Sequence, residues 1–252
     1  MPISKKKKTR ILSRSRRVAH QRNEHSSNSL VNGEWLRDLI LGGQDGLVNV
    51  LGLVLGVAAA TQDTRIVVVA GLAAMFAEGI SMGAVAYTSS KASIEFLARE
   101  KKHELKEIEE DPEEERDEVR RIYFGKGFRG KQLEMIVQKL TANRDRWLQV
   151  MLADELHLQN SNETPLQSAI IVTIAALIGA LFPILPFFFF PVSFAMGVTV
   201  LFSLIVLFIA GALKGHYTKT EWWRSGAELA IIGTGAALIG YVIGSLLSVP
   251  LA

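Results

Sequence analysis

Five long apolar runs constrain the fold of this chain more than any other feature of its sequence. Each has roughly the 20 residues that an α-helix needs to cross the hydrocarbon core of a bilayer. The last three hold no Asp, Glu, Lys or Arg except Glu228 at an edge, whereas a soluble helix keeps one polar face. The sequence therefore predicts an all-α integral membrane bundle of five transmembrane helices, at Leu39 to Ala60, Ile66 to Ser89, Leu166 to Phe187, Val192 to Leu213 and Ala227 to Val249.

Basic residues are distributed unevenly around these runs. Residues 1 to 37 carry ten Lys and Arg against two Glu, whereas the turn from Phe187 to Pro191 has no charged side chain. Because basic segments are retained on the cytoplasmic side, we expect the N-terminus and the segment between the second and third runs to be cytoplasmic. The stretch from Lys5 to Arg22 lacks the aromatic residues that stack on bases. We interpret it as a disordered anchor on anionic lipid, not as a nucleic-acid-binding tail.

The segment between the second and third runs is rich in carboxylates. Seventeen of the 25 acidic residues lie from Lys91 to Glu163, and the chain has no cysteine, which excludes thiolate metal sites. Pro112 and the Gly125-Lys126-Gly127 turn divide this segment into three predicted helices, which end near Glu110, Gly125 and Leu158. The predicted organisation is a basic arm at 1–37, membrane helices at 38–90, a cytoplasmic three-helix carboxylate-rich insert at 91–164, and membrane helices at 165–252.

Acidic side chains recur on one face of each insert helix, and like charges at these spacings repel unless a cation compensates them. Oxygen ligands from facing helices, with one thioether, are typical of sites for divalent iron or manganese. His103 and His157 are either further ligands or surface residues, and we interpret both as surface residues. The acidic run from Glu109 to Glu114 is interpreted as a solvated face. The aligned residues are Glu100, Glu104 and Glu107, then Glu115 and Glu118, then Met151 and Glu155.

The first two membrane runs also hold polar residues. Asp45 and Asn49 are four residues apart, and Glu78 and Met82 repeat that spacing, so each pair projects from one helical face. Carboxylates in the hydrocarbon region are costly and persist mainly where they bind ions or protons. These four residues predict a shared transport path. The alternative, that Asp45 only caps a helix or bonds a neighbour, stays open at this point.

Four motifs together resemble the vacuolar iron transporter family, in their order and spacing, from Arg37 to the end of the fifth run. They are Asp45-Gly46-Leu47-Val48-Asn49, Ile80-Ser81-Met82-Gly83, the two Glu-x-x-Glu pairs around Pro112, and Trp147-Leu148 with Met151 and Glu155. The resemblance implies a homodimer of five-helix subunits that exports Fe²⁺, and often Mn²⁺ or similar divalent metals, from the cytoplasm in exchange for protons.

The same resemblance implies roles for individual residues. The path would include Asp45 and Met82, with Glu78 as a further acid. Plant members of the family carry an acid at the position of Ala74, whereas here Glu78 lies one helical turn further on. The implied metal ligands of the insert are Glu104, Glu107, Glu115, Glu118, Met151 and Glu155.

Two other classes of function remain as alternatives. One is a membrane-anchored iron-storage or ferroxidase-like protein, and the other is a metal-sensing scaffold without transport. Neither needs acids inside its membrane helices. The sequence has no phosphate-cradling Gly-rich Lys loop and no convincing Ser, His and Asp set, so we expect no enzyme activity and no prosthetic group. The compact length favours a prokaryotic cell membrane over a vacuolar one.

Overall fold

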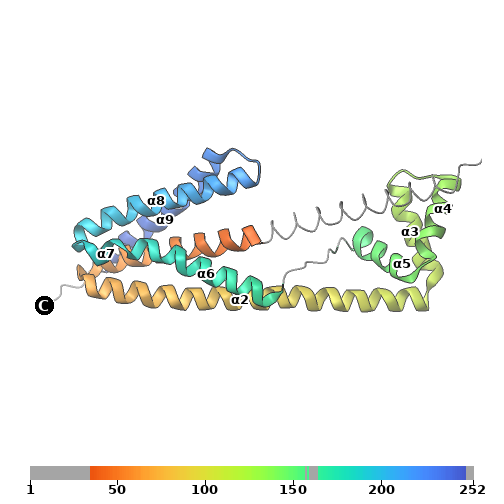
Figure 1. Ribbon diagram of the computed structural model, residues 1–252, viewed down its shortest axis with the longest axis horizontal. Helices are drawn as coiled ribbons and strands as arrows, with labels where there is room; N and C mark the ends of the chain where they lie inside the picture. The colour runs from red at the N-terminus through yellow and green to blue at the C-terminus, as the bar shows by residue number, and fades with distance from the viewer. Residues whose placement is uncertain (1–34, 157, 159–163, 248–252) are drawn as a thin grey trace, which may run out of the picture. The chain divides into compact units, whose positions relative to one another are not determined.

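The computed structural model describes residues 35–156, Leu158 and 164–247, and these residues form helices joined by short turns (Figure 1). No strand occurs in this described part of the chain, which confirms the predicted all-α class. Most of the predicted basic arm, residues 1–34, and His157 lie outside it. The helices are Trp35–Thr61, α2 (Thr64–Glu110), α3 (Pro112–Gly125), α4 (Gly130–Thr141), α5 (Arg144–Val150), the short π-helix η1 (Met151–Glu155), α6 (Pro165–Ile184), α7 (Pro186–Phe189), α8 (Val192–Tyr217) and α9 (Trp222–Leu246).

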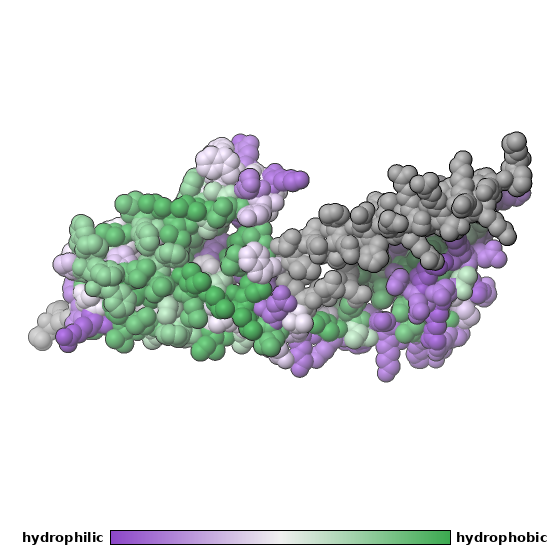
Figure 2. Space-filling model, viewed as in Figure 1, coloured by the Kyte–Doolittle hydropathy of each residue, from purple (hydrophilic) through white to green (hydrophobic). Residues whose placement is uncertain are grey.

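Five of these helices are long and apolar enough to cross a membrane: Trp35–Thr61, which we call the first helix, and α2, α6, α8 and α9. The five predicted spans are thus confirmed. Many large apolar side chains on these helices are exposed, such as Ile80 of α2 and Leu201 of α8. Figure 2 shows the hydrophobic surface that they form. A surface of this kind is stable in lipid and would aggregate in water.

The chain divides into two compact units, with boundaries after Thr88 and after Asn162. We call Ser89–Asn162 the helical unit and the remainder the membrane unit. The helical unit contains the last turns of α2 together with α3, α4, α5 and η1, and the membrane unit contains the five apolar spans. Each unit has its own hydrophobic core.

Local signals in the sequence set the helix ends. The first helix ends at Thr61, Gln62 takes a left-handed backbone conformation (φ 52°), and the Asp63 carboxylate accepts a hydrogen bond from the Arg65 N–H at 2.7 Å. Asp63 therefore caps α2. Thr164 caps α6 in the same way, because its hydroxyl oxygen accepts from the Gln167 N–H at 3.3 Å. The short turn at Gln62 and Asp63 lets the chain reverse direction between the first helix and α2.

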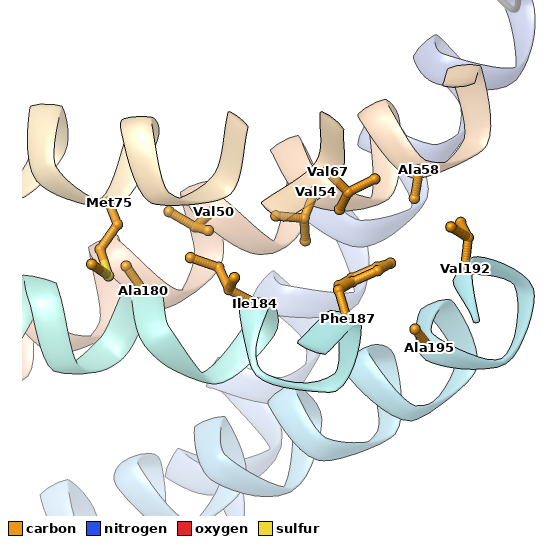
Figure 3. Close-up of a cluster of buried hydrophobic side chains, with 10 residues drawn as sticks. All are labelled: Val50, Val54, Ala58, Val67, Met75, Ala180, Ile184, Phe187, Val192 and Ala195. Carbon is orange, nitrogen blue, oxygen red and sulfur yellow. The ribbon is translucent and has the colours of Figure 1, made fainter. Parts of the chain in front are cut away.

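The first helix lies at the centre of the membrane unit, because two rows of its side chains are buried. One row contains Val50, Val54 and Ala58, spaced by four residues, and packs against residues of α2, α6, α7 and α8. Figure 3 shows this cluster around Ile184 and Phe187. The second row is Leu47, Leu51 and Leu55, and it packs against α8 and α9. Residues four apart lie on one helical face, so the two adjacent rows give this helix two packed sides.

Small residues let the first helix approach two neighbours at backbone distance. Gly46 faces the backbone carbonyl of Ala176 in α6. Further along the helix, the carbonyl of Gly52 faces Gly240 of α9. A methyl group at Gly46 or Gly240 would overlap the facing carbonyl, so glycine is required at both positions for this close packing.

The core of the helical unit combines residues from every helix in it. Its buried apolar side chains are Ile108, Val119, Leu133, Val137, Trp147, Leu148, Met151 and Leu152. Ile108 and Val119 each lie one turn beyond an acidic residue, at Glu104 and Glu115, so those acids share the inward-facing side of α2 and α3. The apolar core thereby fixes where the carboxylates point.

One predicted helix is interrupted. The sequence predicted a continuous helix from Gly130 to Leu158, but α4 ends at Thr141 and α5 begins at Arg144. Asn143 lies between them with an extended backbone, and its side-chain oxygen accepts from the Arg146 N–H at 3.0 Å. This is an N-cap, which starts a new helix. The prediction was wrong here because apolar residues keep a helical spacing on both sides of the break.

Candidate functional site

The polar residues predicted in the first two membrane helices meet in the membrane unit. The Asn49 side-chain amide donates a hydrogen bond to the Glu78 carboxylate, across the first helix and α2. The Asp45 carboxyl also interacts with Glu78, through both charge and a hydrogen bond. Asp45 and Glu78 are half-buried and Asn49 is exposed. Two acids and one amide from two helices therefore form one polar cluster in the membrane unit.

Met82 lies one helical turn after Glu78 on α2 and is half-buried. The four-residue spacing places it on the same side of α2 as Glu78. Two glycines beside these residues, Gly79 and Gly83, bring α2 close to Leu177 and Thr173 of α6.

An open groove of about 590 Å³ lies between the first helix and α9. Val48 and Asn49 line one end of it, and the rest of the lining is small or apolar, with Gly52 and Gly240 among its residues. Asn49 is thus reachable from the outer surface of the membrane unit. The polar cluster is therefore not sealed inside the bundle.

The helical unit brings together acids from three of its helices. Glu104 of α2 and Glu115 of α3 are buried, with 4% and 6% of their surface exposed, and their carboxyl groups are hydrogen-bonded to each other. Glu155 of η1 forms a second such pair with Glu118 of α3. The charge of Glu107 acts on Glu104, Glu115 and Glu155. Five of the six predicted ligands are therefore electrostatically coupled.

Burial and mutual repulsion raise the pKa values of these acids. Burial, followed by the hydrogen bond and charge of Glu115, raises the pKa of Glu104 from 4.5 to about 8. Burial, followed by the charge and hydrogen bond of Glu118, raises the pKa of Glu155 to about 7. Burial also raises the pKa of Glu115, although its hydrogen bond with Glu104 opposes the shift. Near neutral pH this cluster holds protons that an ordinary surface glutamate would have lost.

Two oxygen atoms of the cluster are buried without a hydrogen-bond partner among the described residues: Oε1 of Glu104 and Oε2 of Glu115. A buried carboxyl oxygen is normally paired, and an unpaired one is costly unless a ligand or ion completes it. No three Asp, Glu or His side chains of residues 35–156 and 164–247 are placed so that they could hold one ion together. The acids form two hydrogen-bonded pairs, Glu104 with Glu115 and Glu118 with Glu155. For one ion to bind both pairs, their carboxylates would have to move closer together.

The sixth predicted ligand, Met151, is fully buried in the apolar core of the helical unit. It is the first residue of η1, whereas Glu155 is the last. His103 lies on the exposed side of α2, where its Nδ1 is 2.9 Å from the Glu107 carboxylate. The acids from Glu109 to Glu114 are all exposed, as the solvated-face interpretation predicted.

Two further polar contacts were not predicted from the sequence. Asp38 is buried at the start of the first helix, accepts a hydrogen bond from the Ser168 hydroxyl of α6, and pairs with the Arg37 guanidinium at 3.0 Å. In the helical unit, the Tyr123 hydroxyl donates to the Asp154 carboxylate at 3.0 Å. The partners lie 130 and 31 residues apart, so no local sequence pattern signals either contact.

Comparisons with known proteins agree over most of the chain. A family model described as the VIT family matches residues 36–245. A protein named vacuolar iron transporter 1 from Arabidopsis thaliana is 35% identical over 221 residues, which cover 87% of this chain and 88% of that protein. The vacuolar iron transporter 1 of Eucalyptus grandis is 33% identical over 220 residues, covering 86% and 88%. The vacuolar iron transporter of Plasmodium falciparum (isolate 3D7) is 28% identical over 239 residues, covering 90% and 88%.

Proposed function

This chain belongs to the VIT family, as its motifs predicted, and we propose from that membership that it transports Fe²⁺ across a membrane. It is an integral multi-pass membrane protein of a transporter family, and not an enzyme. The plant and parasite relatives carry the name vacuolar iron transporter, which supports iron as the cargo. Mn²⁺ is proposed as a second cargo, because carboxylate-rich sites with one thioether accept both metals.

The polar cluster of the membrane unit is the observation that carries this proposal. Asp45, Asn49 and Glu78 converge from two membrane helices. Membrane helices that serve only as an anchor have no use for two half-buried acids, whose insertion costs a few kcal/mol each. The proposed path is lined by these three residues and by Met82, whose thioether supplies a soft ligand that favours a transition metal over magnesium or calcium.

The helical unit is proposed to collect the metal before transport. Its acids are held close together by an apolar core, and two of their buried oxygens have no partner among the described residues. A divalent cation would neutralise the repulsion within this group and satisfy those oxygens. The proposed ligands are Glu104, Glu107, Glu115, Glu118, Met151 and Glu155.

Proton exchange is the proposed source of coupling. Glu104 and Glu155 have pKa values of about 8 and about 7, so metal must displace protons from them near neutral pH. We propose the same competition at Asp45 and Glu78, with protons from an acidic far side releasing the metal. The basic N-terminal segment argues for a cytoplasmic N-terminus and helical unit. We propose export from the cytoplasm, because the helical unit would then collect metal on that side.

The proposed assembly is a homodimer, and the proposed location is a prokaryotic cell membrane, with a vacuolar membrane as the other candidate. The open apolar groove along the first helix and α9 supports association with a membrane helix of a second copy, because its lining is small or apolar. The basic arm at 1–37 is proposed to hold anionic lipid on the cytoplasmic side.

A storage or ferroxidase-like protein and a metal-sensing scaffold are the competing functions. Both need only the carboxylates of the helical unit, and both would tolerate loss of the membrane acids. Transport would not, because Asp45 and Glu78 line the proposed path. The three functions therefore differ in what a substitution at Asp45 should do.

Metal uptake into proteoliposomes tests the proposal. The full chain is reconstituted with an acidic interior, Fe²⁺ is added outside under reducing conditions, and uptake is compared for the wild type, Asp45→Asn and Glu228→Gln. Glu228 is the matched control, since it is an exposed acid in a membrane helix that pairs with Lys214 at 3.8 Å. Transport predicts uptake by the wild type and Glu228→Gln and none by Asp45→Asn. Equal uptake by all three, or by none while metal still binds, would reject the proposal.

A further inference from the structure

Three side chains at the end of α3 and in η1 form a closed set of contacts. The Tyr123 hydroxyl donates to Oδ2 of Asp154 at 3.0 Å, and the Lys126 ammonium lies 2.5 Å from Oδ1 of the same carboxylate. The Lys126 ammonium also lies 4.6 Å from the centroid of the Tyr123 ring. Each residue thus contacts the other two. We call Tyr123, Lys126 and Asp154 the clamp.

The clamp acts on an unusual stretch of backbone. Met151–Glu155 is a π-helix, in which each N–H bonds the carbonyl five residues earlier; the Leu156 N–H, for example, bonds the Met151 carbonyl at 3.1 Å. Such turns are rare and occur mostly as single turns, often at functional sites. They persist only where surrounding contacts hold them. Asp154 is inside this turn, so the clamp supplies a contact from outside.

The π-turn changes the direction of Glu155. In an α-helix, Met151 and Glu155 would lie on one face, because they are four residues apart. The wider π-turn changes the direction of each side chain that follows it, relative to the helix before it. Met151 is fully buried in the apolar core, and Glu155 is coupled to Glu118 and to the acids of α2 and α3. The orientation of Glu155 therefore depends on η1 keeping this form.

We propose that the clamp positions Glu155 for metal binding. Tyr123 and Lys126 hold Asp154 by a hydrogen bond and an ion pair, and these contacts keep η1 in its π-helical turn. The inference rests on the proposed function, because it takes Glu155 as a metal ligand. Tyr123, Lys126 and Asp154 are positioning residues here and do not touch the metal.

The chemistry of the clamp suits this role. Burial, followed by the hydrogen bond and charge of Asp154, raises the pKa of Tyr123, so its hydroxyl stays protonated and remains a donor. Lys126 neutralises the charge of Asp154 and holds its carboxylate in place. Asp154 thus anchors the turn, and the adjacent Glu155 is the acid that we assign to the cation.

A double-mutant cycle with Mn²⁺ as the probe tests the clamp. The full chain in detergent is titrated with Mn²⁺ as wild type, Tyr123→Phe, Glu155→Gln and the double variant. Loss of a hydrogen bond to a charged group predicts a roughly tenfold weaker affinity for Tyr123→Phe. In the Glu155→Gln background the same change should have no further effect, because the side chain that the clamp positions is no longer a ligand. Tyr217→Phe, at an exposed position on α8, is the matched control and should bind like the wild type.

The cycle separates the clamp from the metal site itself. If the wild type does not bind Mn²⁺, or if Glu155→Gln binds as well as the wild type, the proposed metal site fails. If Glu155→Gln weakens binding but Tyr123→Phe does not, only the clamp is wrong. An equal loss in both backgrounds would show a general structural effect and would also reject the clamp.

A second variant covers the case in which Tyr123→Phe does not fold. Lys126 is partly exposed, and its removal leaves no cavity in the core. Lys126→Gln should weaken Mn²⁺ binding several-fold, and Lys126→Arg should retain it because the guanidinium can still pair with Asp154. Equal affinity for Lys126→Gln and the wild type would contradict the clamp.

Discussion

Asn49 and Glu78 are joined by a hydrogen bond between two membrane helices, with the Asn49 amide as donor and the Glu78 carboxylate as acceptor. A carboxylate in a low-dielectric environment depends on such donors to remain ionised, because burial penalises its charge. The bond therefore fixes the position of the acid that we propose to face the cargo.

Asn49→Leu should reduce Fe²⁺ uptake into proteoliposomes by roughly ten- to a hundredfold, since a hydrogen bond to a charged group contributes about 1.5–3 kcal/mol. The initial rate of uptake measures the loss. Thr234→Val is the control, because the Thr234 hydroxyl bonds the Ala230 carbonyl of its own helix at 2.8 Å. Uptake by Asn49→Leu at the wild-type rate would mean that the Asn49–Glu78 contact has no part in transport.

Metal binding by the helical unit should strengthen as pH rises. The pKa values of Glu104 and Glu155 are about 8 and about 7, so at pH 6 both are largely protonated and a cation must displace their protons. The affinity for Mn²⁺ should therefore increase between pH 6 and pH 8, by up to about tenfold per pH unit for each proton displaced. Calorimetric titrations in buffers of different ionisation enthalpy measure both the affinity and the protons released. A flat profile without proton release would contradict the assigned acids.

The stability of the metal-free chain should change with pH in the opposite direction. Because the folded pKa of Glu104 lies above its unfolded value of 4.5, the folded chain holds more protons than the unfolded chain between about pH 4.5 and 8. Its contribution to the free energy of unfolding is thus complete at low pH and lost as pH rises toward 8. Thermal unfolding of the metal-free chain should show a lower Tm at pH 8 than at pH 6, by an amount that Glu104→Gln reduces. Glu110→Gln, at an exposed residue paired with Lys106, should leave the pH dependence unchanged.

Close packing between the first helix and α9 gives a prediction about folding. Gly240→Ala should destabilise the chain by about 1–3 kcal/mol, because the new methyl group would overlap the Gly52 carbonyl. Gly235→Ala is the matched control on the same helix, since a methyl group there meets no atom within 4 Å among the described residues. It should be neutral or stabilising. Thermal unfolding in detergent distinguishes the two, and equal Tm values would indicate that α9 does not pack on the first helix as described.

The membrane spans and the polar residues of the membrane cluster could be predicted from the sequence, because both are signalled by local spacing. About 20 apolar residues are enough to define a span, and the four-residue spacing of Asp45 and Asn49 places both on one face of the first helix. The polar groups on two consecutive helices predicted a shared path, but not a hydrogen bond between Asn49 and Glu78. The partner and the direction of the bond required the packed structure.

Features that depend on contacts between distant residues could not be predicted from the sequence. Asp38 directly precedes the first apolar run, and only its contact with Ser168, far along the chain, shows that it is buried. The π-turn of η1 carries no sequence signature of its own, because its residues have the spacing of an α-helix. It depends on Tyr123 of α3 and on Lys126, which directly follows that helix, and pattern analysis cannot connect either residue to Asp154.

Simultaneous recording of metal entry and internal pH in proteoliposomes tests the central claim most directly. With an acidic interior and Fe²⁺ outside, proton-coupled transport predicts that metal enters while the interior becomes more alkaline. Both traces should be lost in Asp45→Asn, and metal entry should slow when the pH gradient is collapsed. Metal entry without any change in internal pH, or with the same rate in Asp45→Asn, would contradict the account.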